Sequence, residues 1–225
     1  MDWPPALFAD RQEAGERLAR ELRARQLVPE RVLAVPRGGV VVAAEIARAL
    51  GCPLDVVLAR KIGAPGQREL AIGAVVSDDP EPLLDERAIE YLGVPAAYLE
   101  AEIAAQRIEL DRQLCLYRGD RPPPSVHGRV VAVVDDGVAT GATLRAALRS
   151  LRRQQPARLI VAVPVAPVAT VERLAAEADA VVCLATPEPF YAVGAAYADF
   201  RQVTDEEVCR LLALSGDPHR PDPAP

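Results

Sequence analysis

A run of five apolar residues followed by two acids constrains this chain most strongly. Residues 130–143 read VVAVVDDGVATGAT, so the strand-like run from Val130 to Val134 leads directly into Asp135 and Asp136. An unbroken β-branched run is typical of a strand buried on both faces, as in a parallel sheet. Open α/β sheets place their ligand sites at the carboxyl ends of such strands. We therefore expect Asp135 and Asp136 to lie at a binding site.

Small residues and hydroxyls follow the acids and precede a helical pattern over residues 144–151. Small side chains at a helix N-terminus let backbone N–H groups approach an anion, and Thr140 and Thr143 add hydroxyl donors. Two carboxylates repel phosphate but suit sugar hydroxyls or hydrated Mg²⁺. The stretch thus predicts a pocket for a phosphorylated sugar. The alternative is an ordinary strand-loop-helix turn with capping acids. A Walker P-loop is excluded, because no Gly-Lys-Ser/Thr follows the strand.

The stretch resembles the signature of the type I phosphoribosyltransferases, which bind 5-phosphoribosyl 1-diphosphate (PRPP). That signature is a hydrophobic strand, two acids, two variable residues, and a small or acidic residue before Thr-Gly-x-Thr, and this chain matches each position. The resemblance implies that Asp135 and Asp136 hold the ribose hydroxyls and meet Mg²⁺ indirectly, through those hydroxyls or water. It implies that the 5′-phosphate is held by the loop that follows, comprising Ala139, Thr140, Gly141, Ala142 and Thr143.

A second strand, expected over residues 32–35, ends in Pro36-Arg37-Gly38-Gly39 and leads into a helix. Two glycines permit close approach to an anion, and Arg37 supplies a fork of donors, although such a sequence also occurs in structural turns. In the family that the signature resembles, the corresponding loop binds pyrophosphate, often through a non-proline cis peptide. The resemblance therefore implies that Arg37, Gly38 and Gly39 form a pyrophosphate loop.

A third strand, expected over residues 54–58, precedes a basic stretch at residues 59–73. The glycines, proline and charges of that stretch predict a mobile surface loop. A hairpin that pairs residues 71–76 with 82–84 is expected beside it.

This basic stretch resembles the Arg-Lys-x-Gly…Pro-Gly segment that precedes the flexible loop of adenine phosphoribosyltransferases. The resemblance implies that Arg60 and Lys61 contact pyrophosphate. Cations there assist catalysis, because the leaving group gains negative charge in the transition state. Glu69 is a weaker candidate for an acid near the base. The alternatives are a solvated basic turn for the cations and a solvent-facing side chain for Glu69.

Strand and helix patterns alternate along the chain, which predicts an α/β fold with a doubly wound, mostly parallel sheet. Further strands are expected over residues 159–163 and 180–184. We expect one phosphoribosyltransferase-like domain over residues 1–214, with a core of about 30–84 and 129–185. An amphipathic pattern near the N-terminus indicates a helix that packs on the sheet.

A helical insertion over residues 85–117 separates the basic stretch from the signature strand. Apolar residues form a stripe along it and charges cover the other side. This arrangement suits a lid or the interface of a homodimer. We identify no catalytic residue in the insertion. Residues 118–128, which contain three consecutive prolines, are expected to form a stiff linker back to the core.

The segment 186–203 concentrates the aromatic residues Phe190, Tyr191, Tyr197 and Phe200. In the family, a hood near this stage of the chain recognises the base, so we expect one ring, with Phe190 and Tyr191 as candidates, to stack on the acceptor. The alternative is that the rings pack the helix expected over residues 205–214 onto the sheet. The polar, proline-rich tail at 215–225 is expected to be disordered.

Composition excludes several classes of function. The net charge of −6 is opposite to that of most nucleic-acid binders, and the four cysteines lack metal-binding spacing. Neither a signal peptide nor an apolar run of about 18 residues occurs, which predicts a cytoplasmic protein without a membrane partner. The absence of asparagine and the 21 prolines suit a thermophile. Lys61 is the single lysine among 26 basic residues.

Together these features predict a Mg²⁺-dependent phosphoribosyltransferase that transfers the phosphoribosyl group of PRPP to a nitrogenous acceptor, such as a nucleobase, and releases pyrophosphate. Ala139 disfavours a 6-oxopurine acceptor, because enzymes of that type usually carry aspartate there. The helical insertion departs from the usual adenine-type layout. The chain is most similar to bacterial members whose acceptor is unassigned. A PRPP-binding regulator without catalysis, and a non-catalytic scaffold, are the alternatives.

Overall fold

Five parallel strands form the main sheet, in the order β2-β1-β6-β7-β8. This computed structural model describes residues 6–215, without the side chain of Glu69. The strands are β1 (Arg31–Ala34), β2 (Leu54–Val56), β6 (Val130–Val134), β7 (Arg158–Val165) and β8 (Ala180–Ala185). The predicted α/β fold with a doubly wound parallel sheet is confirmed.

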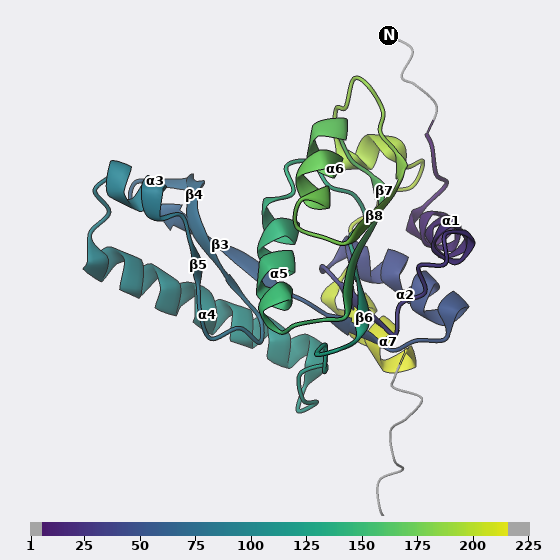
Figure 1. Cartoon of the computed structure of the whole chain (residues 1–225), viewed down its shortest axis with the longest axis horizontal. Helices are drawn as coiled ribbons and strands as arrows, with labels where there is room; N and C mark the ends of the chain where they lie inside the picture. The colour runs from purple at the N-terminus through teal and green to yellow at the C-terminus, as the bar shows by residue number, and fades with distance from the viewer. Residues whose placement is uncertain (1–5, 216–225) are drawn as a thin grey trace, which may run out of the picture.

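Helices cover both faces of this sheet (Figure 1). On one face lie α1 (Arg11–Ala24), α2 (Gly38–Leu50) and α7 (Asp205–Leu214), and on the other lie α5 (Ala142–Arg153) and α6 (Val168–Ala175). Alternate residues of β6 serve the two faces, because successive side chains of a strand point in opposite directions. Ala132 and Val134 join the core against α1 and α2, whereas Val131 and Val133 join the core against α5.

The strand order reverses between β1 and β6, which are paired in parallel from Arg31↔Val131 to Ala34↔Val134. From β1 the chain proceeds outward to β2, and from β6 it proceeds to β7 and β8. A ligand site is expected outside the carboxyl ends of the strands at such a switch point. The two motifs that follow these strands, Pro36–Gly39 and Asp135–Asp136, therefore meet at the same edge of the sheet.

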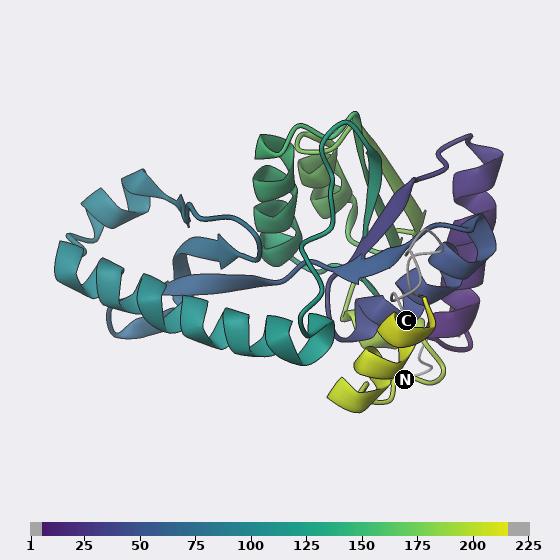
Figure 2. The ribbon, with the colours of Figure 1, turned by 90° about the horizontal axis from the view of Figure 1, so that it is seen from below.

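Residues 59–118 form a separate layer, which we call the arm, that extends away from the main sheet (Figures 1 and 2). A three-stranded antiparallel sheet comprises β3 (Ala59–Ala64), β4 (Gln67–Val76) and β5 (Leu83–Leu84). It is followed by α3 (Glu86–Tyr91) and the long α4 (Ala96–Arg118).

The prediction of a mobile loop over residues 59–73 is wrong, because β3 and β4 pair from Ala59↔Val76 to Ala64↔Gln67. Ile62 and Ile72 are fully buried in the core and hold the hairpin. The pairing predicted between residues 71–76 and 82–84 is confirmed, with Gly73 opposite Leu84.

A buried arginine fastens the arm to the main sheet. Arg118, the last residue of α4, is 4% exposed. Its guanidinium donates to Asp55 of β2 at 3.2 Å, to Asp78 after β4 at 2.8 Å, and to the carbonyl oxygen of Val56 at 3.2 Å. A buried charge of this kind requires such partners. Arg118 thus joins the end of the insertion to an edge strand of the core.

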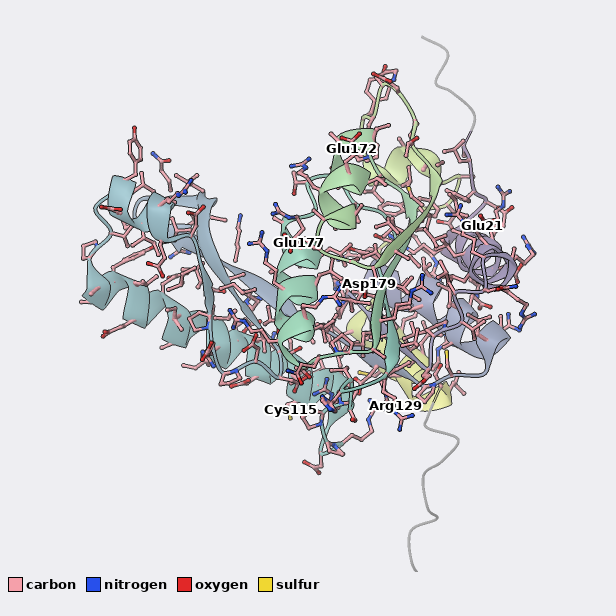
Figure 3. The ribbon with its side chains drawn as sticks, in the orientation of Figure 1. Glu21, Cys115, Arg129, Glu172, Glu177 and Asp179 are labelled. Carbon is pink, nitrogen blue, oxygen red and sulfur yellow. The ribbon has the colours of Figure 1, made fainter. Side chains whose placement is uncertain are left out.

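Ion pairs also tie α5 to the turn between α6 and β8. Glu177 accepts from Arg149 at 2.6 Å and from Arg145 at 3.2 Å, and Asp179 accepts from Arg152 at 3.0 Å (Figure 3 labels both acids). These contacts hold the helix that follows the signature loop.

One predicted helical segment is interrupted. The insertion over 85–117 divides at residues 92–95, where Gly93 has a positive φ and Pro95 precedes α4. The segment 186–203 contains only a 3₁₀ turn (Val193–Ala196), whereas α7 spans the predicted residues. Ser215 caps α7, and residues 216–225 of the predicted disordered tail lie outside the described part of the chain. No helix among residues 6–215 has both the length and the apolar character needed to cross a bilayer.

Candidate active site

The two motifs at the strand ends are in direct contact. A Cβ atom added to Gly38 would lie 1.8 Å from Oδ2 of Asp136, and one added to Gly39 would lie 2.9 Å from Cα of Asp135. Only glycine therefore fits at either position without movement of the acids. The Pro36–Arg37 peptide bond is cis. The structure thus brings the predicted pyrophosphate loop against the predicted ribose-binding acids.

The two acids occupy different environments. Asp135 is partly buried, and its Oδ1 accepts from the backbone N–H of Asp136 at 2.9 Å. Burial and the neighbouring charge of Asp136 raise the pKa of the Asp135 carboxyl well above its ordinary value. Asp136 instead accepts from the Arg11 guanidinium at 2.7 Å, and its backbone carbonyl accepts from the Tyr197 hydroxyl.

The signature loop is hydrogen-bonded and packed against α6 on one side, and its other side is exposed. Gly141, with φ +78°, caps the N-terminus of α5, where an added Cβ would lie 3.2 Å from the methyl group of Thr170. The buried Thr170 hydroxyl donates to the carbonyl oxygen of Ala139 at 2.7 Å. Ala139, Thr140, Ala142 and Thr143 are exposed. The loop therefore presents the hydroxyls and the first turn of α5 to an incoming anion.

A cleft of 960 Å³ separates this loop from the arm. Thr140, Ala142 and Thr143 line one wall. Arg60 and Lys61 of β3 line the other, together with Gly63, Arg68, Ala71, Gly73 and Ala74 of the hairpin and Glu102, Ala105 and Gln106 of α4. Cationic groups thus face an anion-binding loop across one cavity, although the two walls are about 80 residues apart in sequence.

Helix α4 positions the basic residues of β3. Arg60 donates through Nε to Oε1 of Gln106 at 2.8 Å, and Gln106 donates in turn to Glu102 at 2.8 Å. The Tyr98 hydroxyl donates to the carbonyl oxygen of Gly63 at 3.0 Å. No catalytic residue was predicted in the insertion, and the contact of Gln106 with Arg60 was not predicted either, because it spans 46 residues.

Arg37 extends toward the C-terminal helix. Its guanidinium lies 4.0 Å from the carboxylate of Asp205, which accepts from the Tyr117 hydroxyl at 2.5 Å. Burial and this hydrogen bond raise the pKa of Tyr117. The Arg37 side chain stays 41% exposed, so it remains accessible to an anion beside Gly38.

The aromatic residues after β8 divide into two groups. Tyr197 is 5% exposed, lies 5.2 Å from Phe200 and 5.4 Å from Phe8, and so forms part of the core. Phe190 is partly buried against the same cluster, and Tyr191 is 63% exposed. Among the four, Tyr191 therefore retains the most surface for an acceptor. Its role, like that of Phe190, stays a prediction.

Glu69 lies on β4, but its side chain is outside the described part of the structure, so its predicted role stays untested.

The acid pair suits a divalent cation that is bound by few protein groups. Among the described residues, no group of three or more Asp, Glu, His or Cys side chains could hold a metal ion. Mg²⁺ commonly uses one or two carboxylates together with substrate phosphates and waters. Asp135 and Asp136 match that donor set.

Arg11 is a site residue that the sequence did not predict. It is the first residue of α1, and 125 positions separate it from Asp136. One weak local signal exists, because a cation in the first turn of a helix opposes the helix dipole.

Comparison with known proteins yields one consistent family. The model of the phosphoribosyl transferase domain matches residues 9–198. The chain is 43% identical over 206 residues to "Putative phosphoribosyl transferase MT0597" of Mycobacterium tuberculosis strain CDC 1551, and equally to Rv0571c of strain H37Rv. The alignment covers 92% of this chain but 46% of each relative, so the chain spans about half the length of these relatives.

Among solved structures, TT1426 from Thermus thermophilus superposes with a TM-score of 0.82 at 50% sequence identity, covering 92% of this chain and 98% of that one. The family model, these relatives and the signature at the switch point agree. The chain belongs to the type I phosphoribosyltransferase family, and its acceptor is unassigned.

Proposed function

We propose that this protein transfers the 5-phosphoribosyl group of PRPP to a nitrogenous acceptor of the nucleobase type and releases pyrophosphate. This proposal rests on one observation, namely that Arg60 and Lys61 line the same cleft as Thr140 and Thr143. The acid pair precedes Thr140 in the signature loop and packs against Gly38 and Gly39. A molecule that carries a phosphate, a ribose and a diphosphate matches this set of groups.

Each wall has a distinct role in the proposed reaction. Thr140, Gly141 and Thr143 bind the 5′-phosphate at the N-terminus of α5, while Asp135 and Asp136 accept hydrogen bonds from the ribose hydroxyls. Arg37 and the N–H groups of Gly38 and Gly39 bind the pyrophosphate from the core side, and Arg60 and Lys61 approach it from the arm. The bond between C1 and the pyrophosphate oxygen breaks as the acceptor nitrogen bonds to C1.

Catalysis in this scheme consists of positioning and charge stabilisation. Negative charge grows on the departing pyrophosphate, so Lys61 and Arg60 stabilise the transition state more than the bound substrate. Asp135 and Asp136 would be the residues that hold Mg²⁺, through ribose hydroxyls or water, and the ion would supply neutralisation of the pyrophosphate charge. The carboxylates of Asp135 and Asp136 hold those hydroxyls and suit that ion.

Ala139 narrows the range of acceptors in the proposed reaction. Ala139 is exposed on the loop, and its methyl group cannot exchange a proton with a purine nitrogen. A 6-oxopurine is therefore the less favoured acceptor. The stacking surface is assigned to Phe190 or Tyr191, and Glu69 is retained as a candidate acid near the base.

A pyrophosphate-release screen tests this proposal. Purified protein is incubated with PRPP, Mg²⁺ and each of a panel of nucleobases and related amines, and pyrophosphate is measured. We expect release above the PRPP-hydrolysis background with at least one acceptor. Tight PRPP binding without release from any acceptor would instead favour the regulator that binds PRPP without catalysis. The single-domain division, the homodimer, the cytoplasmic location and the thermophilic origin stay predictions.

A further inference from the structure

A buried ion pair lies directly behind the proposed ribose site. Arg11 is 8% exposed, and its Nε lies 2.7 Å from Oδ2 of Asp136. The two side chains are 9% and 15% exposed. This contact differs from the other ion pairs of α1, such as Arg17 with Glu13, whose side chains are 43% and 33% exposed.

The Arg11 guanidinium is held on several sides. Its second nitrogen donates to the carbonyl oxygen of Arg201 at 2.8 Å, and its centre lies 3.8 Å from the middle of the Phe200 ring. The Tyr197 ring lies 5.9 Å away, and the Tyr197 hydroxyl donates to the backbone carbonyl of Asp136. The segment around 197–201 therefore fixes both members of the pair.

Stability alone does not account for this arrangement. A buried ion pair seldom stabilises a protein more than apolar residues of similar volume would, because both charges lose water. Arg11 also opposes the dipole of α1 at its first position. The desolvation of the ion pair and the unfavourable interaction with the helix dipole both occur beside Asp136, an acid of the signature motif.

The geometry also fixes which oxygen of Asp136 is engaged. Oδ2 bonds to Arg11 and lies against Gly38, where an added Cβ would be 1.8 Å away. Rotation of the carboxylate would break the Arg11 bond. The carboxylate is thus held in one orientation before any ligand arrives, and such preorganisation increases affinity.

We propose that Arg11 is a positioning residue for the ribose of PRPP, which holds Asp136 by Oδ2 and leaves Oδ1 to accept from a ribose hydroxyl. This inference rests on the proposed function. It assigns the first residue of α1 to the donor site and gives the packed Tyr197–Phe200 pair a role in supporting that residue.

The test compares three ligands by calorimetry: PRPP with Mg²⁺, ribose 5-phosphate, and pyrophosphate with Mg²⁺. Arg11→Met keeps the length of the side chain and removes its charge. We expect it to weaken PRPP and ribose 5-phosphate binding roughly tenfold or more, because Asp136 loses its charged partner. Pyrophosphate affinity should fall clearly less than ribose 5-phosphate affinity, because Arg60 and Lys61 of the arm also bind pyrophosphate in the proposed scheme. A general loss of structure would weaken all three ligands.

Arg17→Met is the matched control, since Arg17 lies on the same helix, pairs with an acid and lies 5.3 Å from the Phe8 ring, but is exposed. It should leave all three affinities unchanged. In the Asp136→Asn background, Arg11→Met should cause little further loss, because the two residues act through one contact.

Wild-type protein that binds no PRPP would overturn the proposed function and this inference together. Wild-type binding that Arg11→Met leaves intact, a parallel loss of pyrophosphate, or additive losses in the double variant would overturn this inference alone. If Arg11→Met does not fold, Arg11→Lys serves instead, because one ammonium group does not reproduce both hydrogen bonds of the guanidinium. Unchanged PRPP affinity in Arg11→Lys and in Asp136→Asn would then count against it.

Discussion

The two walls of the cleft are built in different ways. On the core side, the signature loop follows β6, four of whose five residues are fully buried between two helical layers. On the arm side, Arg60 and Lys61 lie on a three-stranded sheet whose β3 begins with partly buried and exposed residues, and Arg60 is oriented by one hydrogen bond to Gln106. The core wall is therefore rigid by packing, whereas on the arm wall the hairpin is packed through Ile62 and Ile72 but the Arg60 side chain is oriented by a polar contact.

This difference assigns a separate task to each wall. A fixed loop suits recognition of the unchanging phosphoribosyl group, since a site held by rigid elements is the more precise. Cations on a less embedded layer can adjust to pyrophosphate as it departs. Arg118 joins the two walls through Asp55 and Asp78. Variants that disturb one wall should thus have effects that the other wall does not show.

The largest effect is expected where the walls join. Arg118→Met leaves the buried Asp55 and the more exposed Asp78 without their cation, which should lower the free energy of unfolding by about 3–5 kcal/mol. Urea denaturation measures this loss. Arg112→Met provides the control on the same helix, because its pair with Glu109 is exposed and should contribute little to stability. A loss for Arg118→Met no larger than that of the control would mean that the arm does not depend on this joint.

Removal of the arm's lysine should affect catalysis rather than stability. Lys61→Met is expected to lower kcat by roughly 100-fold, the scale for loss of one preorganised group at a developing charge. Steady-state rates with the acceptor found by the screen, together with the melting temperature, check this. Arg87→Met, an exposed arginine of α3, is the control. An unchanged kcat for Lys61→Met would remove the arm's cations from the mechanism.

On the core wall, Asp135 should make stability depend on pH. Its raised pKa means that the folded protein binds more protons than the unfolded chain, so its contribution is present at low pH and is lost as pH rises through the raised pKa. Asp135→Asn should therefore stabilise the protein at neutral pH by on the order of 1 kcal/mol and by less near the ordinary carboxyl pKa. Melting temperatures from about pH 4 to 8 test this. A destabilised variant at neutral pH would contradict it.

The smallest effect is expected at the support of Arg60. Gln106→Ala removes one hydrogen bond and should weaken pyrophosphate binding by about threefold to tenfold. Calorimetry with pyrophosphate and Mg²⁺ measures it. In an Arg60→Met background the same change should have little effect, and equal losses in both backgrounds would show that Gln106 does not act through Arg60.

The same contrast explains how much the sequence could predict. The run Val130–Val134 and the helix Asp205–Leu214 were predicted to the residue, because local apolar pattern and capping residues agree with their final burial. Residues 59–73 of the arm were predicted as a loop because of their glycines, proline and charges. In the structure an added Cβ at Gly63 would lie 2.8 Å from the backbone of Arg68, and one at Gly73 would lie 2.6 Å from the oxygen of Leu83. These glycines permit close strand approach, which local sequence does not distinguish from a turn.

The site shows the same limit. Residues within contiguous motifs, from Arg37 to Gly39 and from Asp135 to Thr143, could be proposed as site residues because the motif itself carries the signal. Arg11 and Gln106 were missed because their roles arise from contacts across 125 and 46 residues. No local pattern encodes such contacts, since they depend on how the layers pack.

The most direct test of the central claim, that the cleft and the adjoining acid pair bind PRPP, is calorimetric titration of the protein with PRPP and Mg²⁺, repeated with Asp136→Asn. We predict binding by the wild type and an affinity about tenfold or more lower in the variant, because a hydrogen bond to a charged group is lost. The variant should also be less stable than the wild type, because Arg11 stays buried without its carboxylate. No heat of binding by the wild type at millimolar PRPP, or an unchanged PRPP affinity in the folded variant, would contradict the account.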